Sequence, residues 1–555
     1  MAELGPEKRI LLAFALSLLV LVVWSRYMQK KYPPRPPAAP PPATTEAPVP
    51  PLPRAEAPPA PPMPGQKVGQ QEREIVVETD VARIVFSTRG AVVRSWTLKD
   101  YRDTTGEPLD LVHPLAGTHL GYPLSLSLAD SEREQALNRA LFVASSDQEE
   151  LRAPAELTLE YSDGKLAARK HLRFRDGNVI ELDTQVLAEG RPLEHGVAWR
   201  GGFGDASLET NWADLQVVWR DPQKIQRKAA QKIEGKESLS GPFAYGGLED
   251  RYFVAVFLPA TPGLRLSVQR AEWKPEGEEK PRPVAQLAAS VSDGTPLQLF
   301  VGPKSIEALE QVRPPAGGPS LDELVDFGFF GVIARPIFLG MRWIHQHWIP
   351  NYGWAIVLLT VAINMALFPL KWKSLQSSYK MQKIAPQVRA IQEKYKKYRF
   401  NDPRKQQMQQ ELMALYREHG VNPIGGCLPL LLQIPFFYAF YKVLVVAIEL
   451  RHAPWFGWIQ DLSARDPYYI LPVVMTLTMY VSTKMTPMTT ADPAQQKMMT
   501  LMPFLFGFLF LTVSSGLVLY WLMSNLVGIG QQYWINRQQR ARAEAEKLSK
   551  RKKKP

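Results

Sequence analysis

The side chains best suited to acid–base chemistry lie between residues 70 and 320, and their spacing fits no known catalytic pattern. They include four histidines and several acids. The set is His113, His119, His171, His195, Glu194, Asp205 and Glu209. None of these spacings indicates a catalytic or metal site. Cys427 is the only cysteine, which excludes an intramolecular disulfide and a multi-cysteine metal site. We therefore expect no enzyme, no cofactor and no metal.

A second group of polar residues lies within or between strongly hydrophobic segments. Thr360 precedes Asn364 by one helical turn, so both should face the same side of a helix. Gln433 lies in the next such segment, and Ser514 and Ser515 separate the last two. Polar groups in these surroundings mark either a substrate path or hydrogen bonds between helices.

The elements that carry these residues follow from composition. Hydrophobic residues form 45% of the 555-residue chain and concentrate at 10–24 and 354–534, whereas residues 70–320 have the composition of a soluble domain. The net charge of +12 lies mostly beside the hydrophobic segments, which argues against DNA binding. We divide the chain into an N-terminal transmembrane anchor (1–31), a Pro/Ala-rich linker (32–69), a β-sandwich domain (70–320), an interfacial amphipathic helix (321–350), a five-helix core (351–536) with a helical hairpin (374–419), and a basic tail (537–555).

The first hydrophobic segment, Ile10 to Trp24, is either a cleavable signal peptide or a retained anchor. The residues from Trp24 to Tyr27 offer no small-x-small cleavage site, which favours the anchor. From Pro33 to Pro64 the chain is mostly proline and alanine, which predicts an extended spacer.

The domain at 70–320 shows the alternation of half-buried strands. Apolar and polar residues alternate at 157–162, 180–186 and 264–269. Many short strands with Gly and Asp turns predict a large antiparallel β-sandwich. We expect helix only at 305–312 and 223–236. The segment 321–347 then becomes amphipathic, with Pro336 bending it, and either lies in the membrane interface or packs on the sandwich.

Five further hydrophobic segments bring the expected number of transmembrane helices to six. They are about 354–370, 428–450, 469–485, 499–513 and 516–534. Between Lys371 and Arg417 there are twelve Lys or Arg against three acids, and the tail from Arg537 to Lys554 has nine against two. Both should therefore be cytoplasmic, together with the N-terminus, and the β domain falls outside.

The cytoplasmic stretch between the second and third segments should form a helical hairpin. Apolar residues recur every three or four positions from Met381 to Tyr395 and again from Met408 to Leu415. Asp402 and Pro403 are typical of a helix start, Gly420 is typical of a helix end, and Pro386 should kink or start the first helix.

Three long stretches give the chain a strong resemblance to the YidC family of insertases, over roughly Leu321 to the C-terminus. They are Val421-Asn-Pro-Ile-Gly-Gly-Cys427, Asp461-Leu-Ser-Ala-Arg-Asp-Pro-Tyr-Tyr-Ile-Leu-Pro472 and Ser515-Gly-Leu-Val-Leu-Tyr520. The resemblance implies five core helices around a hydrophilic groove open to cytoplasm and lipid. The anchor and β domain resemble the Gram-negative form of the family, whose large periplasmic domain is an all-β supersandwich.

The resemblance also assigns candidate site residues. In the family an arginine commonly lines the groove five residues before a Pro-Leu pair, whereas this chain has Asn364 before Pro369-Leu370. Lys442 either supplies a replacement charge or extends to an interface. Tyr520 and Trp521 match the place where the family contacts substrate, although aromatic residues also simply pack between helices. The full substrate-groove set is Thr360, Asn364, Gln433, Ser514, Ser515, Tyr520 and Trp521.

The function implied is insertion and chaperoning of newly made membrane proteins in the bacterial inner membrane, alone or with the Sec translocon. The partners implied are nascent membrane proteins, the Sec translocon, membrane lipids and, through the hairpin and basic tail, the ribosome. Two alternatives remain: a solute transporter, and an envelope protein whose periplasmic domain binds carbohydrate.

Overall fold

The computed structural model describes residues 65–552, except 209–210, 262, 276–280, 291–295, 399–401, 422–427 and 487–492. The predicted anchor, the linker as far as Pro64, Glu209 and the motif at 422–427 therefore lie outside the described residues. Along the described chain a β-rich region is followed, from residue 331, by a helical region.

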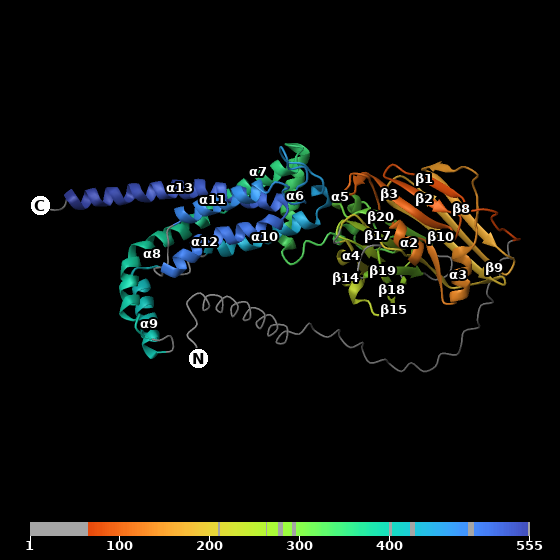
Figure 1. The fold of residues 1–555 in the computed structure, drawn as a ribbon, viewed down its shortest axis with the longest axis horizontal. Coiled ribbons are helices and arrows are strands. Elements are labelled where there is room, and N and C mark those ends of the chain that lie inside the picture. The colour runs from red at the N-terminus through yellow and green to blue at the C-terminus, as the bar shows by residue number, and fades with distance from the viewer. Residues whose placement is uncertain are drawn as a thin grey trace. The chain divides into compact units, whose positions relative to one another are not determined.

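Three sheets form the β-rich region, and every strand pair is antiparallel except β1 with β7 (Figure 1). One sheet has the order β4 (Pro108–Asp110), β3 (Val92–Arg102), β2 (Ala82–Ser87), β1 (Glu74–Glu78) and β7 (Glu150–Arg152). Another has the order β15 (Lys236–Ser240), β18 (Arg265–Trp273), β19 (Arg282–Ser290), β12 (His195–Trp199) and β5 (Ser125–Leu128).

The largest sheet has ten strands. Its order is β14 (Ile225–Ala229), β13 (Gln216–Arg220), β16 (Tyr245–Glu249), β17 (Phe253–Pro259), β20 (Leu297–Pro303), β10 (Val179–Ala188), β9 (Leu166–Phe174), β8 (Ala155–Ser162) and β6 (Val143–Ala144), with β11 (Arg191–Pro192) beside β10. Inward residues of all three sheets share one hydrophobic core, for example Phe86, Leu172 and Leu266. The predicted strands at 157–162, 180–186 and 264–269 are thus confirmed, because one face of each sheet is buried.

The short helices of this region are only partly as predicted. The expected helix at 305–312 is present as α5 (Ile306–Glu310). The expected helix at 223–236 is wrong: β14 and β15 occupy its ends, because pairing with β13 and β18 outweighs the local preference of Gln and Lys for helix. Three helices were not predicted, α2 (Pro114–Leu120), α3 (Ser131–Arg139) and α4 (Asn211–Asp214).

The predicted amphipathic segment at 321–347 is split in two. A 3₁₀ turn, η2 (Leu321–Leu324), packs on the β-rich region, where Glu323 accepts from Arg220 at 2.6 Å. Gly328, at φ +67°, then turns the chain before α6 (Gly331–His347). Pro336 lies inside α6, whose buried face contacts α7 and α10. Val332 and Trp343 stay exposed.

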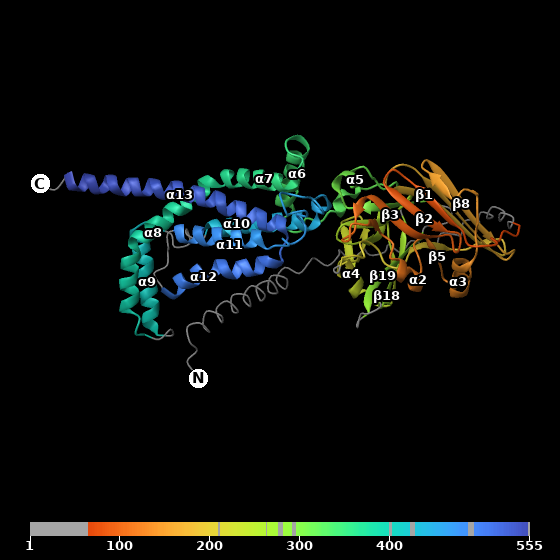
Figure 2. The same ribbon diagram turned by 45° about the horizontal axis from the view of Figure 1, so that its top comes forward.

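The helical region continues with long helices that pack against one another (Figure 2). They are α7 (Tyr352–Ala366), α8 (Phe368–Lys394), α9 (Pro403–Glu418), α10 (Leu428–Val446), α11 (Ile470–Met485), α12 (Pro493–Leu509) and α13 (Ser515–Lys552), with 3₁₀ turns η4 (Ile448–Leu450) and η5 (Phe510–Thr512). Helix α12 ends at Leu509, and η5 and Val513 separate it from Ser514 and from the start of α13 at Ser515. α13 contacts α7, α10 and α11.

The predicted hairpin is confirmed as α8 and α9. Met381, Ile384, Val388 and Leu412 form its small buried core. Asp402 caps α9 by accepting from the amide of Arg404 at 2.9 Å, and Pro403 is the first residue of the helix. Gly420 follows the end of α9 at φ +58°, and Pro386 lies within α8.

Large apolar side chains remain exposed over α11 and α12. They include Val473, Leu477, Val481, Leu501, Phe504, Leu505 and Phe508. A contiguous exposed surface of this kind indicates a lipid environment. Within the described residues no single helix meets the length and hydropathy of a complete span, whereas α7 and α8 together do so across a 57° bend. Shorter apolar stretches lie at Gln433–Val446, Ile470–Met485 and Gln496–Thr512.

Candidate functional site

Asn364 lies at the centre of a buried hydrogen-bond network. It is in the last turns of α7 and is 3% exposed. Its side-chain amide donates to the carbonyl of Thr360 at 2.8 Å and to Ser524 Oγ at 3.4 Å. Thr360 is fully buried and donates to Ile356 within α7 at 2.6 Å. Thr360 and Asn364 share a face of α7, as their spacing predicts, and that face is turned to α13.

Helices α10 and α13 complete the network. Gln433 of α10 donates to Ser524 Oγ at 2.8 Å and to the hydroxyl of Tyr520 at 3.3 Å. Gln531, two turns beyond Ser524, donates to the carbonyl of Asn364 at 3.1 Å. Three predicted site residues, Asn364, Gln433 and Tyr520, therefore meet around Ser524. We call Asn364, Gln433, Tyr520, Ser524 and Gln531 the polar network.

A cation also contacts this network, and it is not the one considered from the sequence. Lys371 Nζ donates to Asn364 Oδ1 at 2.6 Å. The helix axis bends by 57° between α7 and α8, and Lys371 lies beyond the bend, seven residues or about two turns after Asn364. Pro369 lies in the first turn of α8, where proline is tolerated because its missing N–H has no intrahelical partner.

Lys442 lies elsewhere. It is nine residues beyond Gln433 on α10. Its Cε lies 3.1 Å from the point where a Cβ would stand if Gly328 had a side chain. Lys442 is therefore beside the turn at Gly328 and makes no contact with Asn364 among the described hydrogen bonds.

The remaining predicted residues lie apart from the polar network. Ser515 begins α13 and donates through both its amide and its hydroxyl to the carbonyl of Ala464, at 2.7 and 2.9 Å. Ser514 forms a β-bridge with Arg465. Both serines therefore join α13 to the preceding loop. Trp521 packs in an aromatic cluster, with its ring centroid 4.9 Å from that of Phe437 and 5.3 Å from that of Phe510.

Sequence reasoning missed Lys371, Ser524 and Gln531. Ser524 follows Tyr520 by one turn and thus shares its face, which is a signal that could have found it. Lys371 lies seven residues, about two helical turns, beyond Asn364, and that spacing could have indicated the contact although Pro369 lies between them. Polar residues also continue along α13: Asn525 donates to Thr478 at 3.4 Å, and Gln532 donates to Asn536 at 2.6 Å.

A helical region with an apolar outer surface and a buried polar network, joined to a β-rich domain, defines a polytopic membrane protein with a large domain outside the bilayer. Comparison with known proteins agrees. Residues 343–543 match the family model described as 60Kd inner membrane protein, and residues 74–339 match the YidC periplasmic domain.

Similar proteins are named Membrane protein insertase YidC. The relative from Syntrophus aciditrophicus is 35% identical and covers 96% of this chain and 100% of its own length. The relative from Geobacter metallireducens is also 35% identical, over 96% of this chain and 98% of its own. A solved structure of an active YidC insertase is 19% identical and covers 84% of this chain and 94% of its own, with a TM-score of 0.37. The chain belongs to the YidC family of membrane protein insertases, with a helical membrane domain and a β-rich periplasmic domain.

Proposed function

We propose that this protein inserts transmembrane segments of newly made proteins into the inner membrane and helps them fold and assemble, alone or with the Sec translocon. One observation carries the proposal: a buried polar network that joins α7, α10 and α13 inside the helical bundle, with the ammonium of Lys371 bonded to it. Such groups are costly within a membrane domain and are usually functional there.

The network supports insertion for a physical reason. Moving a polar peptide into hydrocarbon costs several kcal/mol unless it finds hydrogen-bond partners. Amides and hydroxyls such as those of Gln433 and Ser524 can exchange bonds with an entering chain when the helices separate into a groove. The apolar segment of the substrate then partitions into lipid, and the burial of roughly twenty apolar residues drives the step without covalent chemistry or a cofactor.

Lys371 supplies the positive charge that Asn364 lacks. The family commonly places a groove arginine at the position of Asn364, and here the ammonium reaches the side-chain oxygen of that asparagine instead. The charge therefore enters from the first turns of α8, at the cytoplasmic side of the proposed groove. An ammonium is a compact point charge, which differs from the planar guanidinium of arginine.

The proposed topology has six transmembrane helices, including Ile10 to Trp24, with both termini and the α8–α9 hairpin in the cytoplasm. The periplasmic domain, which includes η2 (Leu321–Leu324), is proposed to be a supersandwich. Ribosomes would meet the hairpin and the basic tail, and lipids would cover α11 and α12.

Site-specific photocrosslinking to membrane proteins stalled on ribosomes tests the proposal. A photoreactive residue at Gln433 or Trp521, both half-buried, should crosslink the nascent segment. The matched controls are Leu477 and Phe508, which are 56% and 72% exposed on the lipid-facing surface. Crosslinks no stronger at Gln433 and Trp521 than at the controls would mean that the network only packs helices.

A further inference from the structure

Arg451, just beyond η4, reaches from the membrane domain into the periplasmic domain. Its side chain is 4% exposed and forms an ion pair with Asp205, which is fully buried. The same guanidinium nitrogen donates to the carbonyl of Arg102 at 2.8 Å. The guanidinium carbon lies 5.6 Å from the ring centroid of Tyr252 and 5.7 Å from that of Phe253, within the range of cation–π attraction.

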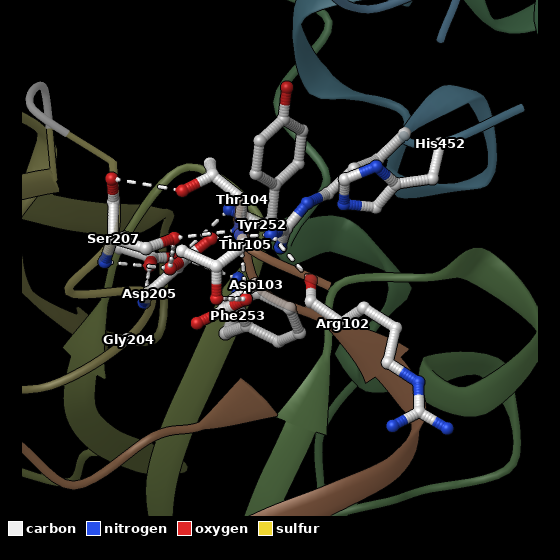
Figure 3. Close-up of polar contacts among 12 residues, drawn as sticks. Arg102, Asp103, Thr104, Thr105, Gly204, Asp205, Ser207, Tyr252, Phe253 and His452 are labelled. Carbon is white, nitrogen blue, oxygen red and sulfur yellow. Dashed lines mark hydrogen bonds and ion pairs between the residues drawn. The ribbon is translucent and has the colours of Figure 1, made fainter. Parts of the chain in front are cut away.

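The periplasmic side of this contact is held in place by hydrogen bonds that do not involve Arg451. Asp205 Oδ1 accepts from the amide and the hydroxyl of Ser207, at 2.9 and 2.6 Å, which fixes the carboxylate (Figure 3). The carboxylate of Asp250 accepts from the amides of Asp205, Tyr252 and Phe253, at 3.2, 2.8 and 2.6 Å. It thereby connects the backbone of Asp205 to the backbone of the two aromatic residues. Asp205 is therefore a preorganised acceptor, unlike a mobile surface acid.

The residues next to Arg451 strengthen the connection. Ile448 of η4 is 2% exposed and belongs to the hydrophobic core of the periplasmic domain. An apolar side chain and a buried ion pair from one short segment thus enter the same domain. Because an unpaired buried charge is strongly unfavourable, Arg451 and Asp205 should stay together or separate with a large rearrangement.

The loop that follows Arg451 covers the periplasmic ends of two helices of the proposed groove. Asn351, the cap of α7, donates to the carbonyl of Trp455 at 3.0 Å. At the start of α13, the amide of Gly516 donates to the carbonyl of Leu462 at 2.9 Å, and Ser515 binds Ala464. We call residues 453–466 the cover loop.

We propose that Arg451 is a positioning residue that locks the cover loop to the periplasmic domain, so that this domain keeps the periplasmic ends of α7 and α13 joined. The lock extends beyond the insertion function, because it concerns how two domains are coupled and needs no substrate. Its consequence is that a displacement of the periplasmic domain is transmitted to the helices that carry Asn364 and Ser524.

Distance measurements between spin labels on the full-length protein in lipid nanodiscs test the lock. With Cys427 replaced by serine, labels are placed at Lys165 and Gln460, which are exposed on the periplasmic domain and the cover loop. The Arg451→Met variant should broaden the distance distribution by about twofold, since the cover loop then fluctuates independently. The matched control is Arg265→Met, which breaks an exposed ion pair to Glu194 within the periplasmic domain and should leave the distribution unchanged.

Two further variants separate loss of the lock from misfolding. Asp205→Asn should broaden the distribution as Arg451→Met does, and Arg451→Lys, which keeps a cation opposite Asp205, should restore most of it. An unchanged distribution in Arg451→Met, or no recovery in Arg451→Lys, would overturn the proposal. The readout requires no nascent chain, so its failure is distinct from failure of the insertase proposal.

Hydrogen exchange of the same variants tests the transmission to the helices. The amides of Ser515 and Gly516, which donate to the cover loop, should exchange about tenfold faster in Arg451→Met, while amides in the middle of α11 remain as in the parent. Unchanged exchange at Ser515 and Gly516 would show that the cover loop holds α13 without the periplasmic domain and would contradict the proposal.

Discussion

Two lysines show how differently the periplasmic and membrane domains treat a buried cation. Lys170 of β9 is fully buried and donates to the carbonyls of Gly90, Ala91 and Leu124, at 2.9, 2.8 and 2.7 Å. All three donors of its ammonium are thus used. Lys371 donates to one acceptor among the described residues, Asn364.

The neighbours of each lysine follow the same contrast. The three acceptors of Lys170 have positive φ angles, of 72°, 50° and 64°, so the ammonium holds together two tight turns. Near Lys371, by comparison, the buried Gln531 Oε1 has no hydrogen-bond partner among the described residues. The periplasmic lysine is saturated and structural, whereas the membrane lysine keeps hydrogen-bonding capacity, which the proposed groove would offer to a substrate. This is the difference that separates a scaffold from a working site.

The largest expected effect comes from Lys170→Met. Removing the ammonium withdraws a donor from three carbonyls in the interior, which should lower the free energy of unfolding of the periplasmic domain by at least about 3 kcal/mol. Chemical unfolding followed by tryptophan fluorescence measures this. Lys165→Met, an exposed lysine nearby, is the control. A loss below about 1 kcal/mol would remove the contrast between the two lysines.

Acid should destabilise the periplasmic domain through His113, a second fully enclosed group. Burial lowers the pKa of His113 from 6.5 to about 4. Between these values the unfolded chain binds a proton that the folded domain does not, so stability falls as pH falls, by about 3 kcal/mol in all. Between pH 7 and pH 4, the free energy of unfolding should therefore decrease with a steeper slope in the parent than in His113→Gln. Equal slopes would mean that His113 is protonated in the folded domain.

Lys371→Met should affect insertion activity more than stability, in contrast to the Lys170 and His113 substitutions. Loss of one charged hydrogen bond of about 1.4 kcal/mol corresponds to roughly tenfold less insertion of a reporter membrane protein, with the midpoint of thermal unfolding nearly unchanged. Lys371→Arg should retain most of the activity. Lys442→Met, beside the turn at Gly328, provides the matched control. If insertion proceeds normally in Lys371→Met, the membrane cation is not part of the working site.

The smallest expected effect is that of Ser524→Ala. The hydroxyl accepts from Gln433 and Asn364, and hydrogen bonds between membrane helices average about 0.6 kcal/mol. Thermal unfolding in detergent should therefore shift only slightly, while crosslinking from Gln433 to a nascent chain should decrease. A large loss of stability would instead assign the network to packing.

The sequence predicted those features that depend on local periodicity. Thr360 and Asn364 lie on one face of α7 because four residues make slightly more than one turn, and the strand at 157–162 follows from alternation. The helix α3 was missed although Asp130 caps it by accepting from two backbone amides, because nine residues give a weak periodic signal. Lys371 was missed because a 57° bend at Leu367 and Pro369 separate it from Asn364, and Arg451 was missed because its partner lies 246 positions earlier.

The continuous helix α13 has a consequence for what lies beyond the membrane. Its 38 residues, Ser515–Lys552, extend over about 57 Å at 1.5 Å per residue, nearly twice the ~30 Å of hydrocarbon in a bilayer. If α13 crosses the bilayer as we propose, about half of the rod projects past the lipid tails. At physiological salt the attraction of anionic headgroups decays over ~8 Å. The final turns of the rod thus stand outside that range, and they meet whatever approaches through water before the membrane surface does.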